Sequence, residues 1–532
     1  MASLRHSPAA SGPFDELRAR GAADWLEPSA AEAAVEAAAG RRPGGAAGSR
    51  DGPELVEVRA PAGGLPSPDD PLVLRFDEPV VAGRGAIRLV GEAGTVKIPV
   101  RDDEQVRIDG AEVRIGPHAA LAAGSTYSLQ LGPRSLRDLD GNRLGALDPE
   151  LLPRLQAGGD AGDGGAEPRA SWTILVYMAA DNDLEPWALA DLAEMERVAL
   201  PGSVNLAALV DRSPWYVAGP GDFTDTRMGP VAPDGDPKRV AAGLVPIGER
   251  DTGDPQTLTE FLDWAHTTFP AERYGLVVWD HGGGLEGVAF DDSSRGDRLT
   301  LAETREAIAA SSLGRVDLLG FDACLMAMAE VAGELAGVAR VMVASQELEP
   351  VEGWAYDRWL GALARDPDAA PTELAERIVE TYAERFAGRR DITLSAVDLE
   401  AIPGLETALD GLARAIATSA DPGDLRALAA AAAAARPTPR DASYPYRDLG
   451  DFLDGIQERV ADPAIAAAAR RAEAALASLV LAEAGTVERA SGLSIHLPAA
   501  GDAPWPDYGP SDYAFLERVG WDGLVDRLVA VG

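Results

Sequence analysis

The chain has 532 residues, which at about 150 residues per domain is enough for three or four domains. Apolar residues make up 46% and charged residues 25%, so a core can be buried and a wholly disordered chain is excluded. The formal net charge of −38 repels phosphate groups, so we expect no nucleic acid partner. The single cysteine, Cys324, excludes an intrachain disulfide and a multi-cysteine metal site.

The first 170 residues divide by composition into three parts. Residues 1–51 are rich in Ala, Gly, Arg and Pro, and we interpret them as a flexible arm. From 52 to 150, short runs with a period of two, such as PLVLRF (71–76), predict an antiparallel β-sandwich. The order of these runs resembles that of bacterial immunoglobulin-like (Ig-like) domains, which implies a module that spaces or binds. Residues 151–170 lack periodicity and are predicted to be a linker.

Five continuous apolar runs between residues 171 and 400 alternate with amphipathic helical patterns. This alternation predicts an α/β domain, a mostly parallel sheet flanked by helices on both faces. The runs are WTILVYMAA (172–180), VNLAALVD (204–211), YGLVVWD (274–280), VDLLGFD (316–322) and VARVMVAS (338–345). Residues 401–532 are mostly helical, and we expect this C-terminal region to pack on the sheet domain and shield its edge.

Two of these runs are followed by residues that can carry chemistry. His281 and Gly282 come after the third run, and Cys324 comes after the fourth. Ligands bind beyond the carboxyl ends of parallel strands, and a right-handed crossover places these two strands side by side or nearly so. An imidazole beside a thiol supplies the base that the thiol needs at neutral pH, so the pair predicts a nucleophile and its general acid/base. The amides of Gly282 and Cys324 are expected to form an oxyanion hole.

Simpler interpretations exist for each residue taken alone. A buried cysteine is usually an inert apolar side chain, and a histidine at a strand end is usually a hydrogen-bonded turn residue. Their matched positions, with glycines beside the histidine, favour the dyad. The other histidines compete poorly, since His6 lies in the arm, His118 in the sandwich and His266 on a helix, while His496 is expected in the core.

A resemblance to the clostripain family of cysteine peptidases, which have a caspase-like fold, rests on five segments. They are TILVYMAADNDLE, VVWDHGGG, LLGFDACLM and PVEGWAY, within residues 171–360, and GLSIHLP near the end. The resemblance implies that Cys324 is the nucleophile, that His281 is the general acid/base, and that the amides of Gly282 and Cys324 stabilise the oxyanion. It requires no third triad member.

Asp322 precedes the nucleophile by two residues, so its side chain is expected on the same side of the strand as that of Cys324. The resemblance implies that this aspartate lines the pocket for the residue before the scissile bond and selects arginine or lysine. An acidic group in a walled pocket pairs well with a guanidinium. The alternative is that Asp322 caps the following helix. Glu352 is a second candidate for the pocket wall.

Self-cleavage is a further implication of the resemblance. The loop after the histidine, GVAFDDSSRGDRL, contains Arg295 and Arg298, so processing is expected at Arg295-Gly296 or Arg298-Leu299.

Two acidic stretches raise the question of a metal ion. Asp181, Asn182 and Asp183 form one, and Asp291 with Asp292 forms the other. Oxygen ligands suit calcium, but neither stretch has the EF-hand pattern, and such residues before a helix are more often N-caps. The resemblance keeps calcium open without locating it, so no cofactor is required and no metal ligand is assigned.

Three functions compete. The first is a cysteine endopeptidase acting on proteins or peptides with basic residues. The second is a binding or adhesion protein whose caspase-like domain is catalytically silent, and the third is a transpeptidase or ligase, since an amine can capture the same thioester. The resemblance implies secretion or display at the cell surface, whereas the chain shows neither an apolar leader nor a run of about 18–20 apolar residues, which leaves a cytoplasmic location open.

Overall fold

The computed structural model places the chain in two compact units, one within Gly40–Glu167 and one within Pro168–Gly532. It describes residues 53, 55–59, 72–83, 86–91, 94–102, 105–117, 126–131, 135–138, 154–156, 169–216, 223–233, 243–419, 421–440, 444–485, 487, 490–498, 505 and 508–531. The expected N-terminal arm lies outside the described residues, as do His6 and His118. Among the described residues, no helix is both long and apolar enough to cross a membrane.

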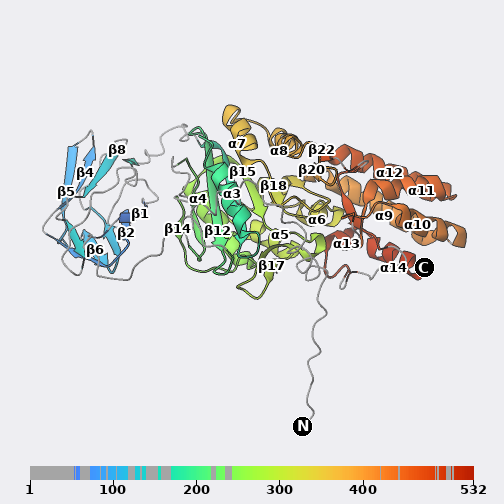
Figure 1. Cartoon of the computed structure of the whole chain (residues 1–532), viewed down its shortest axis with the longest axis horizontal. Coiled ribbons are helices and arrows are strands. Elements are labelled where there is room, and N and C mark those ends of the chain that lie inside the picture. The colour runs from blue at the N-terminus through green and yellow to red at the C-terminus, as the bar shows by residue number, and fades with distance from the viewer. Residues whose placement is uncertain are drawn as a thin grey trace, which may run out of the picture. The chain divides into compact units, whose positions relative to one another are not determined.

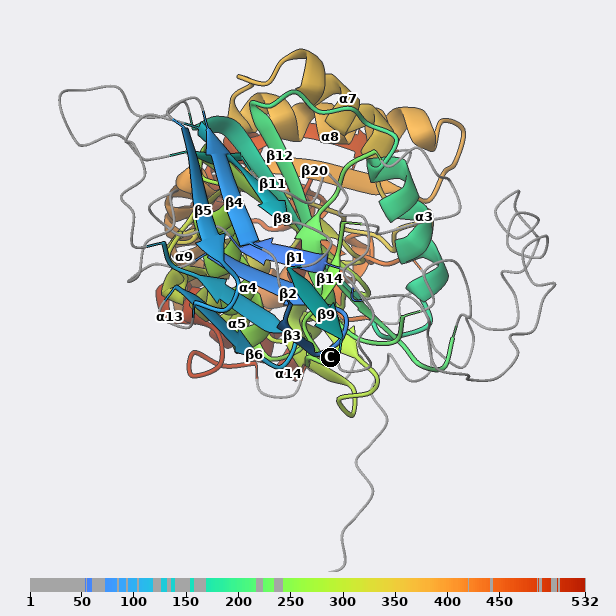
Figure 2. The same cartoon turned by 90° about the vertical axis from the view of Figure 1, so that its left-hand side faces the viewer.

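The N-terminal unit is an all-β structure of two antiparallel four-stranded sheets (Figure 2). One sheet has the order β1-β2-β7-β6, with bounds Leu55–Arg59, Leu72–Phe76, Glu112–Ile115 and Val106–Asp109. The other has the order β10-β8-β4-β5, with bounds Arg154–Gln156, Thr126–Leu131, Ala86–Gly91 and Gly94–Pro99. Strands β3 (Val80–Ala82) and β9 (Leu136–Asp138) form a separate pair. Alternate residues such as Leu72, Leu74 and Ile87 fill one core, so the sandwich prediction is confirmed.

The C-terminal unit is built on a nine-stranded mixed sheet with the order β14-β13-β12-β11-β15-β18-β19-β20-β22. The bounds in that order are Val245–Pro246, Arg227–Pro230, Val204–Arg212, Ala170–Ala180, Ala271–Trp279, Val316–Asp322, Ala339–Ala344, Thr393–Asp398 and Val480–Gly485. The five predicted apolar runs form the five central strands, which in sheet order are β12, β11, β15, β18 and β19. Each pairs in parallel with its neighbours in this group. The outer strands pair antiparallel. The predicted α/β fold with a parallel sheet is therefore confirmed for the five central strands, and the antiparallel outer strands make the whole sheet mixed.

Helices cover both faces of this sheet (Figure 1). On one face lie α3 (Glu185–Met195), α7 (Tyr356–Arg365) and α8 (Pro371–Arg385). On the other lie α4 (Pro255–Thr268), α5 (Leu301–Ala310), α6 (Ala329–Leu335) and α9 (Ile402–Thr418). The remaining helices, α10 (Pro422–Ala434), α11 (Leu449–Arg459), α12 (Pro463–Leu479), α13 (Ala514–Arg518) and α14 (Trp521–Val531), pack against these helices and against one another, and α10 to α12 project beyond the β22 end of the sheet (Figure 1). Both faces of the central strands are thus buried, which is why their sequences are continuously apolar.

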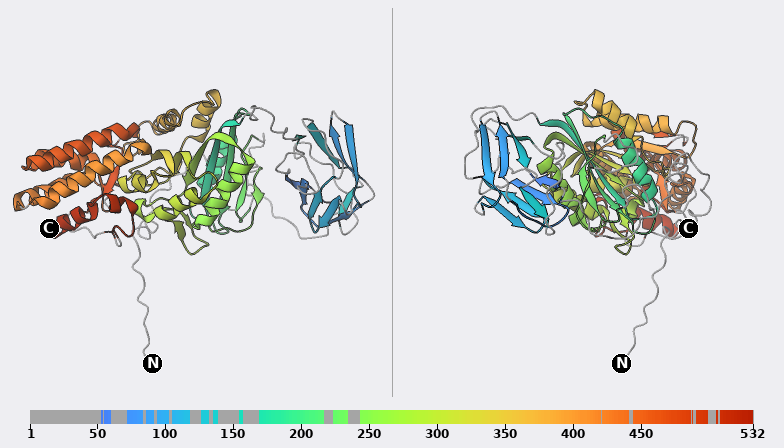
Figure 3. Two further views of the ribbon diagram at one scale, coloured as in Figure 1. Left: turned by 180° about the vertical axis from the view of Figure 1, so that it is seen from behind. Right: turned by 60° about the vertical axis from the view of Figure 1, so that its left-hand side comes forward.

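The C-terminal helical region packs on the sheet and also extends it. Helices α9 to α12 lie against one another, and β22 adds the last strand beside β20 (Figure 3). A short pair, β21 (Tyr446–Asp448) and β23 (Ser494–His496), lies over the carboxyl ends of the sheet strands, where the Ser494 amide donates to the Ala327 carbonyl. His496 is fully buried, as expected for a core residue.

Candidate active site

The two strands that carry the predicted dyad are direct neighbours. In the parallel pair of β15 and β18, Trp279 is opposite Asp322. His281 and Cys324 each follow this pair by two residues, so both lie at the same edge of the sheet, at the ends of neighbouring strands. The side-by-side placement of these two strands, expected from a right-handed crossover, is therefore confirmed.

Gly282 lies tightly against the backbone of the cysteine. A Cβ atom at this position would be 2.3 Å from the Cys324 carbonyl oxygen and 3.1 Å from its amide nitrogen. Any side chain would therefore push the two loops apart. The two amides expected to form an oxyanion hole thus belong to backbone segments in contact with one another.

His281 has a partner that the sequence did not indicate. Its Nε2 atom lies 2.7 Å from Oδ1 of Asp183, and the histidine side chain is 18% exposed. Asp183 follows the end of the neighbouring strand β11. The only signal for it was the polar triplet after the first apolar run, which the sequence pattern favoured as N-caps over metal ligands.

The side chain of Asn182 forms hydrogen bonds with several segments next to His281. Its buried side-chain amide donates to the Ala179 carbonyl at 3.0 Å, to Oδ1 of Asp280 at 2.6 Å and to the Phe290 carbonyl at 3.0 Å. Its Oδ1 accepts from the Leu184 amide at 3.0 Å. One side chain therefore links the segment that carries Asp183 to the segment that carries His281.

Replacing Asp183 by asparagine is expected to lower kcat by about 10- to 100-fold with little change in KM. The variant keeps the shape of the side chain but removes the charge that holds the ring of His281. Steady-state hydrolysis of a peptide substrate measures both constants. Asp292→Asn, in the neighbouring loop, is the matched control and should retain kcat within about twofold. An unchanged kcat in the Asp183 variant would exclude a role in positioning His281.

Cys324 is half-buried in acidic surroundings. Its sulfur accepts a hydrogen bond from the Glu349 amide at 3.2 Å. Burial first, and then the charges of Glu349, Asp322 and Asp280, raise the pKa of the thiol to about 12. The thiol therefore stays protonated near neutral pH unless a base removes its proton or a cation reduces the negative charge around it.

The turn after the cysteine is anchored to the loop that follows β19. Leu325 has a φ of 64°, a left-handed conformation that is uncommon for a leucine. Its amide donates to the Glu347 carbonyl, and the amide of Ala327 donates to the Ser345 carbonyl. Two adjacent backbone segments thus hold the unusual turn in place.

Asp322 belongs to a cluster of three buried carboxyl groups. It accepts from the Trp354 amide at 3.2 Å and from the Tyr356 hydroxyl at 2.9 Å. A Cβ at Gly353 would lie 2.9 Å from an oxygen of Asp322 and 3.1 Å from one of Asp191. Asp322 caps no helix, because α6 begins at Ala329, so the capping alternative is wrong.

The third member of this cluster is Glu349, which lies on the loop between β19 and α7. Burial and the charge of Asp322 raise its pKa well above the usual range. Burial likewise raises the pKa of Asp322 to about 6, and burial together with the charge of Asp322 raises that of Asp191. Arg385 acts on this cluster, but its Nη1 atom already binds Glu194 at 2.8 Å. Burial and mutual repulsion therefore leave the three carboxyl groups with little compensating positive charge.

The second predicted pocket residue, Glu352, lies on the same loop. It is half-buried, and its charge acts on Arg389. Glu349, which the sequence pattern did not single out, is the acidic residue of this loop that lies against Asp322 and Cys324.

The predicted processing sites lie on a hairpin next to the site. Strands β16 (Val288–Asp291) and β17 (Asp297–Leu299) form it. Arg295 is exposed in the connecting turn, with a φ of 68°. Arg298 is held more closely, since its Nε donates to the Glu286 carbonyl at 2.7 Å and its guanidinium lies 5.8 Å from the ring centre of Phe290.

The C-terminal region contacts the loops of the site through polar side chains. Tyr446 donates from its hydroxyl to the Gly283 carbonyl at 2.8 Å and accepts from the Leu285 amide at 3.2 Å. It thus fixes the glycine loop after His281. Nothing in the sequence pattern pointed to this contact.

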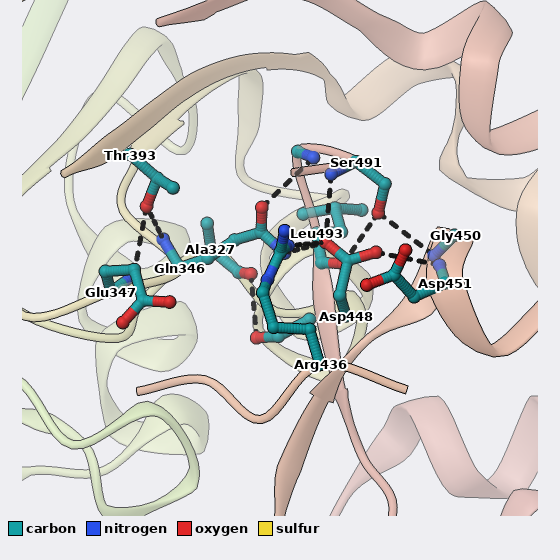
Figure 4. A network of polar contacts seen from close by, with 12 residues as sticks. Ala327, Gln346, Glu347, Thr393, Arg436, Asp448, Gly450, Asp451, Ser491 and Leu493 are labelled. Carbon is teal, nitrogen blue, oxygen red and sulfur yellow. Dashed lines mark hydrogen bonds and ion pairs between the residues drawn. The ribbon is translucent and has the colours of Figure 1, made fainter. Parts of the chain in front are cut away.

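A second set of polar contacts is centred on Asp448 (Figure 4). Its carboxylate pairs with Arg436 and accepts from the Gln346 side chain at 3.0 Å and the Ser491 amide at 2.9 Å. On the other side, Thr393 accepts from the amides of Gln346 and Glu347. This network ties the C-terminal region to the loop whose Glu349 amide contacts the cysteine sulfur.

Comparisons with known proteins point to one family of peptidases. A model of the clostripain family, Peptidase_C11, matches residues 176–524, which includes the C-terminal helical region. Clostripain from Hathewaya histolytica is 31% identical over 294 residues, covering 45% of this chain and 55% of that protein. The chain thus spans about half the length of this curated relative.

Two solved structures share the fold. One is a secreted C11 cysteine protease from Bacteroides thetaiotaomicron in complex with an irreversible peptide inhibitor, with 19% identity, a TM-score of 0.50, and coverage of 66% of this chain and 100% of that chain. The other is an inactive zymogen C11 protease from Parabacteroides distasonis, with 19% identity, a TM-score of 0.50, and coverage of 67% and 99%. Both likenesses support the caspase-like fold expected from the sequence.

Proposed function

The chain belongs to the clostripain family of cysteine peptidases, and we propose that it is an endopeptidase that cleaves after arginine, and less efficiently after lysine. In this proposal Cys324 is the nucleophile and His281 the general acid/base. As a peptidase the protein acts on protein or peptide substrates. The alternative of a catalytically silent scaffold is not favoured, because the family's cysteine and histidine are both present on adjacent strand ends.

The chemistry follows from the placement of these groups. His281 takes the proton of the Cys324 thiol as sulfur attacks the carbonyl carbon, and Asp183 holds the imidazole in orientation. The amides of Gly282 and Cys324 are proposed to stabilise the oxyanion. The imidazolium then protonates the leaving amine, and water, activated by the same histidine, hydrolyses the thioester.

The preference for arginine rests on one observation, the cluster of buried carboxyl groups beside Cys324. Asp322, Glu349 and Asp191 have raised pKa values because burial leaves them poorly solvated and mutually repelling. A guanidinium offers five donors and a permanent charge, and so can satisfy several carboxylates at once, whereas an ammonium offers three donors. A cation there also reduces the negative charge that raises the pKa of the thiol.

The proposal is tested with peptides that differ only in the residue before a fluorogenic leaving group. We expect turnover with Arg, weaker turnover with Lys, and none with Asp, Asn or Leu. Turnover with Asp or Asn would retain the peptidase but contradict the pocket. No turnover with any member of the panel, before or after nicking at Arg295, would favour the silent scaffold.

We also propose that the protein processes itself at Arg295-Gly296. Arg295 is exposed in a hairpin turn, while Arg298 is bound to the Glu286 carbonyl, and proteolysis favours exposed turn tips. Arg295→Gln is expected to abolish the nick, and Arg298→Gln to leave it intact, as read from intact mass and the N-terminal sequence of the new fragment. Cleavage after Arg298, or a nick in a Cys324→Ala preparation, would contradict this assignment.

Export to the cell surface or the medium is our proposal for the location. One structural relative is described as secreted, and the N-terminal sandwich resembles modules of surface proteins. Fractionation of the native host, followed by detection of the chain in medium, envelope and cytosol, tests this directly.

A further inference from the structure

The two backbone segments that carry the proposed oxyanion donors are both held from the C-terminal region. The antiparallel pair β21 and β23 brings Tyr446 and Ser494 onto neighbouring strands. Tyr446 contacts the glycine loop (282–287) that follows His281. Ser494 contacts the turn that follows Cys324. One pair of strands therefore contacts both halves of the site.

The glycine loop folds back on itself and leaves no room for a side chain at its glycines. The Gly283 amide donates to the Gly287 carbonyl at 3.0 Å. Gly284 has a φ of 65°, and a Cβ there would be 2.5 Å from Sδ of Met328 and 3.0 Å from Cε2 of Tyr446. The loop thus packs directly against the ring of Tyr446 and against the residue that precedes α6.

The Tyr446 hydroxyl supplies both a donor and an acceptor to this loop. It donates to the Gly283 carbonyl at 2.8 Å and accepts from the Leu285 amide at 3.2 Å. The Tyr513 hydroxyl adds a longer bond of 3.3 Å to the Leu285 carbonyl. Tyr446 is fully buried, so without its hydroxyl the Leu285 amide would lose this partner away from water. The loop would then move to restore a hydrogen bond.

The ring of Tyr446 is itself fixed by other rings. Its centre lies 5.3 Å from that of Tyr444 in a stacked arrangement, 6.2 Å from that of Trp505 and 6.3 Å from that of His496. Aromatic rings attract one another at separations of about 4.5–7 Å. The packed ring therefore places its hydroxyl at a defined point, as a group that fixes a backbone amide must.

The turn after the cysteine is held from the neighbouring strand. The Ala327 carbonyl accepts from the Ser494 amide at 2.9 Å and from the Ser494 hydroxyl at 3.1 Å. Ser494 belongs to the GLSIHLP segment (492–498), which the dyad itself does not explain. Because β21 and β23 are paired along their length, the spacing of these strands constrains the separation of the two loops they hold.

We propose that Tyr446 is a positioning residue of the oxyanion hole, whose hydroxyl keeps the Gly282 amide close enough to the Cys324 amide for both to donate to one oxygen. This inference rests on the proposed function, because it requires an oxyanion. Removing one donor from an oxyanion hole typically lowers kcat by about 10²- to 10³-fold. Losing the Tyr446 hydroxyl displaces a donor without removing it, so the expected loss in kcat is about 10- to 100-fold.

Tyr446→Phe keeps the ring and removes its two hydrogen bonds to the glycine loop. With an arginyl fluorogenic peptide, kcat should fall by about 10- to 100-fold while KM changes by less than about threefold. Tyr508→Phe is the matched control, because that hydroxyl lies in the same group of rings but donates to Glu330 at 2.8 Å. Its kcat should stay within about twofold of the parent. All proteins are compared after processing is complete, as judged by intact mass.

Inhibition by a peptidyl argininal separates positioning from a general loss of structure. Sulfur forms a bond to the aldehyde carbon, and the electron pair of the carbonyl moves to its oxygen, which the two amides then bind. The matching peptidyl alcohol binds without a covalent bond. In Tyr446→Phe the inhibition constant of the aldehyde should rise at least about tenfold, and that of the alcohol should change by less than about threefold. A damaged pocket would weaken both alike.

Tyr513→Phe provides a graded comparison. It loses a single bond of 3.3 Å to the same loop, so its kcat and its affinity for the aldehyde should lie between those of Tyr446→Phe and Tyr508→Phe. Thermal unfolding of each variant shows whether it is folded under the assay conditions. Tyr513→Phe decides the question if Tyr446→Phe unfolds below the assay temperature.

The outcomes separate this inference from the proposed function. Equal kcat in Tyr446→Phe and Tyr508→Phe, or an equal loss of aldehyde and alcohol binding, would overturn the positioning role of Tyr446. An unchanged kcat in Tyr513→Phe beside an unfolded Tyr446→Phe would do the same. A parent protein that hydrolyses no peptide and forms no adduct with the aldehyde would instead overturn the proposed function, and the oxyanion hole with it.

Discussion

Replacing Cys324 by alanine is expected to lower kcat/KM for an arginyl peptide by at least about 10³-fold. The alanine cannot form the thioester, and no other cysteine exists in the chain to replace it. The side chain is half-buried next to the Glu349 amide, and its replacement removes a single sulfur atom, so folding should be retained. Hydrolysis rates test the loss of activity, and a thermal unfolding curve of the same preparation tests whether folding is retained.

His281→Ala provides the companion variant for this experiment. Without the imidazole the thiol, whose pKa is about 12, stays almost fully protonated at neutral pH, so turnover should fall to a similar extent. His266→Ala is the matched control, since that residue lies on the outer helix α4 and bonds Ser312. Substantial turnover in Cys324→Ala would show that a different residue is the nucleophile.

Replacing Asp322 by asparagine is expected to reduce kcat/KM for arginyl peptides by about 10²- to 10³-fold. Removing one partner of a buried ion pair typically costs about 3–5 kcal/mol, because the other charge is left without compensation. The asparagine oxygen can still accept from the Trp354 amide and the Tyr356 hydroxyl, so the local fold should remain. Glu352→Gln, on the same loop, is the matched control and should change kcat/KM by less than about threefold.

The pH profile provides a second check on the same residue. Burial raises the pKa of Asp322 to about 6, so the carboxyl is neutral below that pH and charged above it. Since only the charged form attracts a guanidinium strongly, kcat/KM for arginyl peptides should fall as pH drops through about 6. The Asp322→Asn variant should lack this acid limb. An equal effect of Asp322→Asn and Glu352→Gln, or an unaltered profile, would contradict the assignment of Asp322 as the selecting residue.

The sequence was most informative where structure is local. Continuous apolar runs such as 172–180 and 316–322 predicted buried parallel strands, and each became one of the central strands. A strand that is covered on both faces must be apolar throughout, so the apolar run in the sequence gives its length and its ends. The positions of His281 and Cys324 followed, because the carboxyl ends of parallel strands lie at one edge of the sheet.

The partners of these residues had to come from the tertiary structure. Asp183 beside His281, Glu349 and Asp191 beside Asp322, and Tyr446 over the glycine loop join segments far apart in the chain. Such contacts depend on how loops cross the sheet edge, and loop residues carry no periodic pattern that reports their direction. Asp183 illustrates the same limit, since an aspartate after a strand has the same sequence signature whether it caps a helix or orients a histidine. The burial of each strand is encoded by its own apolar residues, whereas the order of the strands and the meeting of polar side chains are decided only when the strands are brought together.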